Sequence, residues 1–192
     1  MLHRNSQKRI YFPDAVYFIT CCVEDRFPFF KEETFCGLFI EELKLCKKLK
    51  GFKLFGFVII PDHIQLLIQP NDEYNISKVI KSLKENTSRD INNIILNRQS
   101  EGDTSTCRLR IRELIKEYQN QFIQKYGNNQ FQFPKFKWQK SFHDHYTRND
   151  NDFENHLEYI WRNPEKHGIV KNFEHYKYSS YNNYKELIDN FD

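Results

Sequence analysis

The chain has 192 residues, of which 39% are hydrophobic and 16% aromatic, and these amounts suit a single globular domain. Its 29 basic residues nearly balance its 26 acidic residues, which leaves a formal net charge of +3. This balance excludes a polybasic tail and an acidic disordered segment, and it permits a nucleic-acid partner without requiring one.

The N-terminal segment and the cysteines indicate the cytoplasm as the compartment. Residues 1–10 are polar and basic and lack the apolar core of a signal peptide, and no apolar run in the chain reaches the ~18 residues that a membrane helix needs. The five cysteines are odd in number and include no Cys-x-x-Cys pair. This pattern argues against a disulfide framework and against a structural zinc site.

The first third of the chain predicts a strand, a helix and a hairpin. Residues 16–23 are β-branched and aromatic, as in a buried strand, and residues 32–49 repeat apolar side chains at helical intervals before Gly51. Two further apolar runs, 54–60 and 64–68, are separated only by Pro61-Asp62. So tight a break between two strands favours an antiparallel hairpin.

The middle of the chain predicts two more helices around a polar loop. Residues 75–96 carry an apolar stripe and begin with Asn75 or Ser77 as a possible cap. Residues 98–106 are polar, and residues 108–126 again place apolar side chains in helical phase. The stretch at about 97–134 is therefore expected to be an insertion whose role is open: a lid, a DNA-binding element or a dimer contact.

The last third predicts a strand and a short helix. Residues 131–147 are aromatic and basic and are expected to hold a strand, and residues 152–163 form a helix that Pro164 ends. A tyrosine-rich tail at about 171–192 follows. The order of elements predicts one α+β domain over 1–192, a ferredoxin-like sandwich with helices on one face of an antiparallel sheet, plus the C-terminal helix.

Side chains alternate between the two faces of the strand at 64–68. Its apolar residues share one face, and the other face carries His63, Gln65, Leu67 and Gln69. A histidine and a glutamine two residues apart can converge on a divalent ion. From this spacing alone, an ordinary, partly exposed strand face is the favoured alternative.

The last predicted helix separates its residues more clearly. Its apolar side carries Phe153, Leu157, Ile160 and Trp161; its polar side carries Asp152, Asn155, His156, Tyr159 and Asn163. Tyr159 is thus an aromatic residue on the polar side, with the carboxamide of Asn163 one turn later. Two alternatives follow: a nucleophilic phenol beside a metal-binding amide, or a surface tyrosine that covers a neighbour.

The segment before that helix offers further candidates. Lys135, Lys137, Trp138 and Lys140 interleave bases with an aromatic, as in single-strand binding, although solvated lysines around one buried tryptophan are an equal alternative. His143 and His145 have strand spacing, for which a polar edge strand is slightly favoured. Arg148 follows and could contact phosphate.

Several blocks resemble one family. Pro61-Asp62-His63-Ile64-Gln65-Leu66-Leu67 resembles the Pro-Asn-His-hydrophobic-His-Leu-Leu signature of the HUH single-tyrosine transposases, and in particular of the REP-associated tyrosine transposases. Residues 142–149 resemble that group's His-x-x-Arg-Asn block, residues 156–170 its Tyr-Ile-x-x-Asn-Pro-x-Lys-His-Gly block, and residues 178–181 its Ser-Ser-Tyr. The resemblance extends from about residue 11 to about residue 184, with the blocks in the family's order.

The resemblance implies an enzyme that cleaves and rejoins single-stranded DNA. It implies Tyr159 as the nucleophile, which forms a 5′-phosphotyrosine, and it assigns the ligands of a divalent metal to His63, Gln65 and Asn163. Gln65 departs from the signature, where a second histidine stands. Its neutral carbonyl oxygen suits Mg²⁺ or Mn²⁺, and we expect weaker metal affinity rather than none.

The expected partner is hairpin-forming single-stranded DNA, bound by a protein that is a monomer or a homodimer and acts near the nucleoid. The expected DNA contacts are Lys78, Lys81, Arg89, Lys135, Lys137, Trp138, Lys140 and Arg148. His145 and His156 are accessory candidates for moving the phenolic proton. The alternatives are a nuclease that does not rejoin DNA and a weakened or inactive relative that acts as a nucleic-acid-binding protein.

Overall fold

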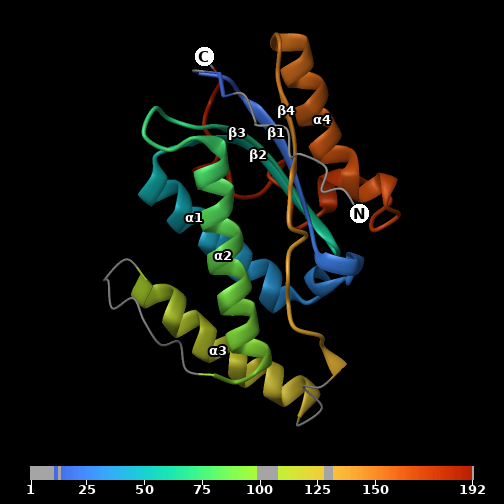
Figure 1. Cartoon of the computed structure of the whole chain (residues 1–192). Coiled ribbons are helices and arrows are strands. Elements are labelled where there is room, and N and C mark those ends of the chain that lie inside the picture. The colour runs from blue at the N-terminus through green and yellow to red at the C-terminus, as the bar shows by residue number, and fades with distance from the viewer. Residues whose placement is uncertain (1–10, 13, 99–107, 128–131, 192) are drawn as a thin grey trace, which may run out of the picture.

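The computed structural model describes residues 11–12, 14–98, 108–127 and 132–191. Four strands and four α-helices follow one another in the order β1-α1-β2-β3-α2-α3-β4-α4 (Figure 1). In the described part of the chain, no helix is long and apolar enough to cross a membrane. The polar loop expected at 98–106 lies outside the described residues except for Arg98.

The four strands form one antiparallel sheet in the order β2-β3-β1-β4. They comprise β1 (Tyr17–Cys22), β2 (Lys53–Ile60), β3 (His63–Gln69) and β4 (His143–Tyr146). The hairpin predicted around Pro61-Asp62 is the β2–β3 pair. This strand order, with β1 and β3 in the middle, confirms the predicted ferredoxin-like α+β fold.

One face of the sheet carries the main hydrophobic core. Helices α1 (Glu33–Lys50) and α2 (Ile76–Ile95) cover this face, and α3 (Leu109–Tyr126) packs against both of them (Figure 1). Gly51 ends α1 in the left-handed conformation, and the side chain of Asn75 caps α2 by accepting a hydrogen bond from the backbone N–H of Lys78. The helical part of the predicted insertion is thus a third layer on this face.

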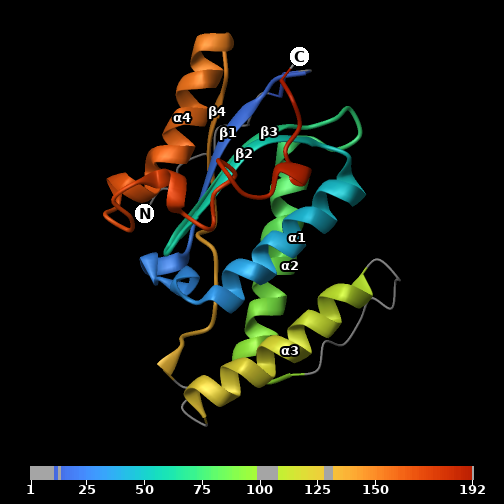
Figure 2. The ribbon, with the colours of Figure 1, turned by 180° about the vertical axis from the view of Figure 1, so that it is seen from behind.

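The other face is covered by α4 (Asp150–Lys166), and parts of the tail pack on it as well (Figure 2). Helix α4 can approach β2 closely because Gly56 has no side chain: a Cβ atom there would lie 2.5 Å from Cδ1 of Leu157. The tail continues the sheet beside β2 through backbone hydrogen bonds from Ile59 N to Tyr178 O and from Ser180 N to Phe57 O. The helices expected on one face are α1 and α2, and the additional C-terminal helix, α4, covers the other face.

The sequence predicted that Pro164 ends the last helix, and this prediction is wrong. Helix α4 continues to Lys166, and the N–H of His167 still donates to the carbonyl of Asn163 at 3.0 Å. A proline removes its own N–H, but the residues after it can still donate backward, so a proline in the last turn does not stop the helix. This extra turn brings Lys166 and His167 to the functional region.

Candidate active site

Polar side chains from β3 and α4 meet on the face of the sheet that α4 covers. The strand register pairs His63 with Cys22 and Gln65 with Thr20 of β1, and it places Phe18 on the same face. Gln65 accepts a hydrogen bond at Oε1 from Nδ2 of Asn163 at 2.8 Å. The histidine–glutamine strand motif and the helix motif therefore come together in the fold.

All three polar residues are buried, contrary to the partly exposed strand face that the sequence suggested. The exposed fractions are 4% for His63, 3% for Gln65 and 1% for Asn163, because α4 lies across β2 and β3. The Oδ1 atom of Asn163 is buried without a hydrogen-bond partner among the described residues. A buried, unpaired carbonyl oxygen is costly, and a bound ligand would relieve that cost.

A carboxylate orients the imidazole of His63. Asp62 Oδ1 lies 2.7 Å from His63 Nδ1, and Arg26 donates to Asp62 Oδ2 at 3.2 Å. Burial lowers the pKa of His63 more than the charge and hydrogen bond of Asp62 raise it. Burial would raise the pKa of Asp62, but its hydrogen bond to His63 and the charges of His63 and Arg26 hold it below its usual value. The ring is therefore neutral near pH 7, and Nε2 is the ring nitrogen that could bind a ligand.

Tyr159 lies on the solvent side of α4. It is 40% exposed, and its ring meets the ring of Phe18 edge-on at 5.8 Å between centroids. The ammonium of Lys166 lies 3.9 Å from the centre of the Tyr159 ring. Tyr146 of β4, by contrast, pairs with Tyr17 and therefore belongs to the opposite face of the sheet.

His167 is a neighbour of the site that sequence reasoning did not select. It follows α4 directly, and its ring centroid lies 5.2 Å from that of His63. The Lys-His-Gly block contained this histidine, but a helix expected to end before Pro164 gave no reason to place it near β3. Lys166 was missed for the same reason.

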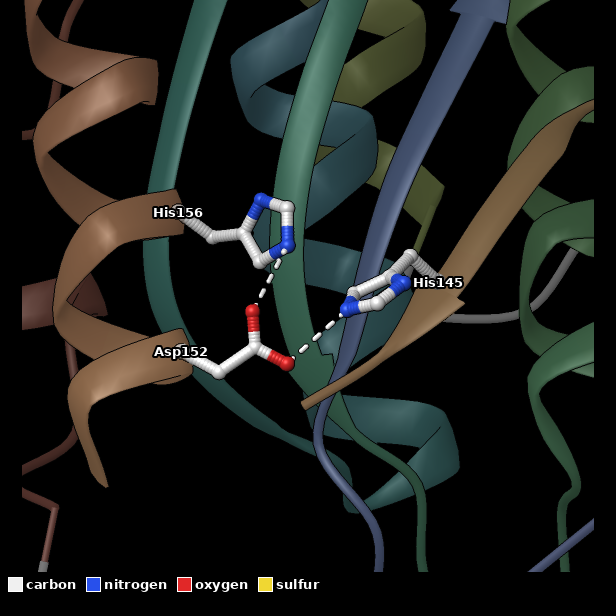
Figure 3. A group of neighbouring side chains, drawn as sticks. All are labelled: His145, Asp152 and His156. Atoms are coloured by element: carbon white, nitrogen blue, oxygen red, sulfur yellow. Dashed lines mark hydrogen bonds and ion pairs between the residues drawn. The ribbon is translucent and has the colours of Figure 1, made fainter. Parts of the chain in front are cut away.

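A second polar cluster lies near the N-terminal end of α4. His145 Nε2 is 2.9 Å from Asp152 Oδ2, and His156 Nε2 is 3.4 Å from Asp152 Oδ1 (Figure 3). His156 stacks on Phe18, with 4.6 Å between ring centroids. The two histidines predicted as accessory residues thus share one carboxylate. Among the described residues, neither imidazole makes a hydrogen bond to the hydroxyl of Tyr159.

The predicted DNA-contacting residues are divided between two places. Lys81, Arg89, Lys135, Lys137 and Lys140 line adjoining hollows of about 570 and 650 Å³ between α2 and the segment before β4. Arg148 lines a separate hollow of about 300 Å³ beside the start of α4. Lys78 is exposed on the first turn of α2.

Trp138 does not have the exposed position that base stacking would require. It is 8% exposed, and its ring packs against Phe30 and Phe136. The segment is extended, so Phe136 and Trp138 face the core while Lys135 and Lys137 face solvent. The aromatic residues anchor the segment, and the lysines form its outer side.

Comparisons with known proteins agree on one family. Residues 12–107, half of the chain, match the family model described as transposase IS200 like. A Haemophilus influenzae protein that carries the name of a REP-associated tyrosine transposase is 28% identical over 184 residues, which cover 92% of this chain and 85% of that protein. A REP-associated tyrosine transposase of Escherichia coli is 41% identical over 44 residues, 23% of this chain and 27% of that protein.

The fold is also shared with a solved structure. A solved structure of a REP-associated tyrosine transposase bound to a REP hairpin covers 93% of this chain with a TM-score of 0.55 and 19% identity, and the match covers 83% of that chain. Members of the family are transposases, whose activity is the cleavage and transfer of DNA. The chain belongs to the IS200-like transposase family, in agreement with its resemblance to the REP-associated tyrosine transposases.

Proposed function

We propose that this protein cleaves and rejoins hairpin-associated single-stranded DNA, with Tyr159 as the nucleophile and a divalent metal as cofactor. The hydrogen bond between Asn163 and Gln65 carries the proposal. Asn163 lies one turn after Tyr159, and Gln65 lies two residues after His63. This contact brings the helix that carries the phenol against the strand that carries the imidazole.

The residues present fit a divalent metal. Asn163 Oδ1 is buried and without a hydrogen-bond partner among the described residues, and His63 holds its Nε2 available because Asp62 engages Nδ1. Two amide oxygens and one imidazole nitrogen suit Mg²⁺ or Mn²⁺. When bound, the metal would orient the scissile phosphate and stabilise the charge that develops on it. His167 adds a second imidazole next to His63, where Gln65 has replaced the signature's second histidine.

Tyr159 would attack the scissile phosphorus in line with the leaving 3′ oxygen. The bond from the phenolic oxygen to phosphorus forms while the bond from phosphorus to the 3′ oxygen breaks. The phenol loses its proton to solvent or a nearby base, and the 3′ oxygen takes up a proton. Lys166, beside the Tyr159 ring, offers a positive charge for the phosphate. Because the phosphotyrosine retains the ester bond, a second DNA end can reverse the step without a nucleotide cofactor.

The basic hollows beside α2 support a hairpin as the substrate. They lie on the other side of β4 from Tyr159, and β4 is an edge strand. A duplex stem held by the lysines there could pass its single-stranded flank around this edge to the phenol. The solved relative that was bound to a REP hairpin makes such hairpins the first substrates to test.

The test is covalent trapping. We expect wild-type protein, incubated with labelled single-stranded hairpins and Mn²⁺, to form an adduct that survives denaturing electrophoresis. Tyr159→Phe is expected to lower adduct formation by at least about 1,000-fold, because the variant has no attacking oxygen. Hairpin binding, measured by gel shift, is expected to change by less than about 3-fold, because the ring remains.

Tyr146→Phe is the matched control. It removes an equally exposed phenol from the opposite face of the sheet, so its adduct yield should equal that of the wild type. An undiminished adduct in Tyr159→Phe would refute Tyr159 as the nucleophile. Cleavage by the wild type without any adduct would instead indicate a nuclease that does not rejoin DNA.

A further inference from the structure

His145, Asp152 and His156 form a compact cluster apart from the residues proposed for catalysis. One ligand atom of each residue can be chosen so that all three lie within 4.8 Å of one another. Figure 3 shows that both imidazole rings point toward the carboxylate between them. The cluster therefore presents two nitrogen ligands and one oxygen ligand to a common point.

The backbone fixes this arrangement. His145 pairs with Phe18 in the sheet register, so it belongs to the face that α4 covers. Asp152 and His156 are four residues apart on α4 and lie on the same side of the helix. Asn149, three residues after the end of β4, caps α4: its side chain accepts a hydrogen bond from the backbone N–H of Asp152. The short connection places the start of the helix beside the strand.

We propose that His145, Asp152 and His156 bind a transition-metal ion of the Zn²⁺ class, at a site separate from His63, Gln65 and Asn163. A tetrahedral ion with ligand bonds of about 2.1 Å places its ligand atoms about 3.3–3.5 Å apart. The recorded separations are 2.9 Å from His145 Nε2 to Asp152 Oδ2 and 3.4 Å from His156 Nε2 to Asp152 Oδ1, which are the two oxygens of one carboxylate. Because one ligand atom from each residue lies within 4.8 Å of the other two, a small adjustment of the side chains would bring the three atoms to that spacing. Two imidazoles with one carboxylate favour Zn²⁺, Co²⁺ or Ni²⁺ over Mg²⁺, which prefers oxygen ligands.

The surroundings leave room for the ion and hold the ligands in place. The three side chains are 33%, 25% and 24% exposed in chain order, so water can reach the site and complete the coordination. The ring of Phe18 supports the ring of His156 at an interplanar angle of 13°, and the N–H of Arg148 donates to Asp152 Oδ2 at 3.1 Å.

An ion at this site would join β4 to α4 next to the turn that carries Tyr159. Phe18 contacts both His156 and Tyr159, with ring centroids 4.6 and 5.8 Å away. The site would thus restrain the helix that presents the phenol, although it does not touch the phenol itself. This role does not depend on whether Tyr159 attacks DNA.

The experiment measures Zn²⁺ binding without DNA, in full-length protein carrying His63→Ala so that the other candidate site is disabled. We expect one Zn²⁺ per chain by calorimetry with a competing chelator, Co²⁺ absorption bands of tetrahedral intensity, and no displacement by a 100-fold excess of Mg²⁺. Adding His156→Gln is expected to lower the Zn²⁺ affinity by about 100-fold.

His143→Gln is the matched control, because His143 is an exposed histidine two residues before His145 on the same face of β4. It should change the affinity by less than about 3-fold. If circular dichroism shows that His156→Gln does not fold, His145→Gln replaces it, since that side chain comes from the edge strand. The proposal is overturned if the His63→Ala protein binds no stoichiometric Zn²⁺, if the ligand variant binds as well as its parent, or if His143→Gln loses as much affinity as the ligand variant.

Discussion

The two faces of the sheet differ in composition and in what they do. The face under α1 and α2 buries an almost wholly apolar set of side chains, including Ile19, Phe57 and Leu66. The face under α4 buries His63, Gln65 and Asn163 together with a smaller apolar cluster. Since buried polar groups cost free energy unless they are paired, the first face is the one that favours stability, and the second is the one on which we propose chemistry.

The largest difference between the two faces is expected for adduct formation after substitution of His63 or Ile64, two neighbouring residues of β3. His63→Ala should lower metal-dependent adduct formation by at least about 100-fold, because it removes the proposed imidazole ligand. Ile64→Val, on the opposite face, should lower the free energy of unfolding by about 0.5–1.5 kcal/mol and leave adduct formation unchanged. Covalent trapping and urea unfolding of both variants check the pair. Equal adduct yields in the two variants would remove the functional contrast between the faces.

An intermediate effect is expected at the closest approach of α4 to the sheet. Gly56→Ala should lower the free energy of unfolding by about 1–2 kcal/mol and adduct formation by about 10-fold, because the new methyl displaces Leu157 and shifts α4. Gly37→Ala is the control, because its Cβ would instead meet the hydroxyl of Tyr118 on the α1 and α3 side. If Gly37→Ala impaired trapping as strongly, the loss could not be assigned to the position of α4.

The smallest effect concerns a buried ionic group beneath α3. Arg108 donates to the buried carboxylate of Glu42 at 2.8 Å and also pairs with Asp90. Burial, with a smaller contribution from Asp90, raises the pKa of Glu42 to about 8 against the opposing charge of Arg108. The folded protein therefore holds a proton that the unfolded chain releases above its ordinary carboxyl pKa, so stability should fall as the pH rises from about 5 to about 8.

Glu42→Gln should flatten this pH dependence. Between pH 5.5 and 8.5 the wild type is expected to lose about 1–2 kcal/mol more unfolding free energy than the variant, as measured by urea titration at both pH values. Parallel stability curves would show that Glu42 is ionised in the folded protein throughout this range. Adduct formation should be insensitive to this substitution, because Glu42 lies on α1 beneath α3, on the side of the sheet away from α4.

The sequence predicted the elements because their periodicities are local. The apolar runs of β1 and β2, the amphipathic stripe of α2 and the break at Pro61-Asp62 all depend on residues close together in the chain. Sequence reasoning also selected the residues that meet in the structure, because strand alternation grouped His63 with Gln65, and helical spacing grouped Tyr159 with Asn163. The metal and nucleophile roles of these residues remain predictions.

What the sequence could not determine depends on how elements pack. It gave no sign that α4 covers the second face of the sheet, so it left His63 and Gln65 partly exposed, where the structure buries them. It left open whether Trp138 stacks on bases or fills the core, and the packing of Phe30 and Phe136 decides for the core. Burial depends on the surface that packs against a residue, and for His63 and Gln65 that surface is α4, where Asn163 lies 98 positions after Gln65 in the chain.

The amino-acid sequence by itself determined the order of strands and helices, the family resemblance and the residues able to act as ligands or nucleophile, since these follow from residue type and spacing. Only the tertiary structure decided which side chains lie next to one another: Asn163 and Gln65, His167 and His63, and Asp152 with both His145 and His156. The physical reason is that contacts between β3, β4 and α4 arise from the close approach of α4 over Gly56 and from the register of the sheet, and neither is encoded within any one segment.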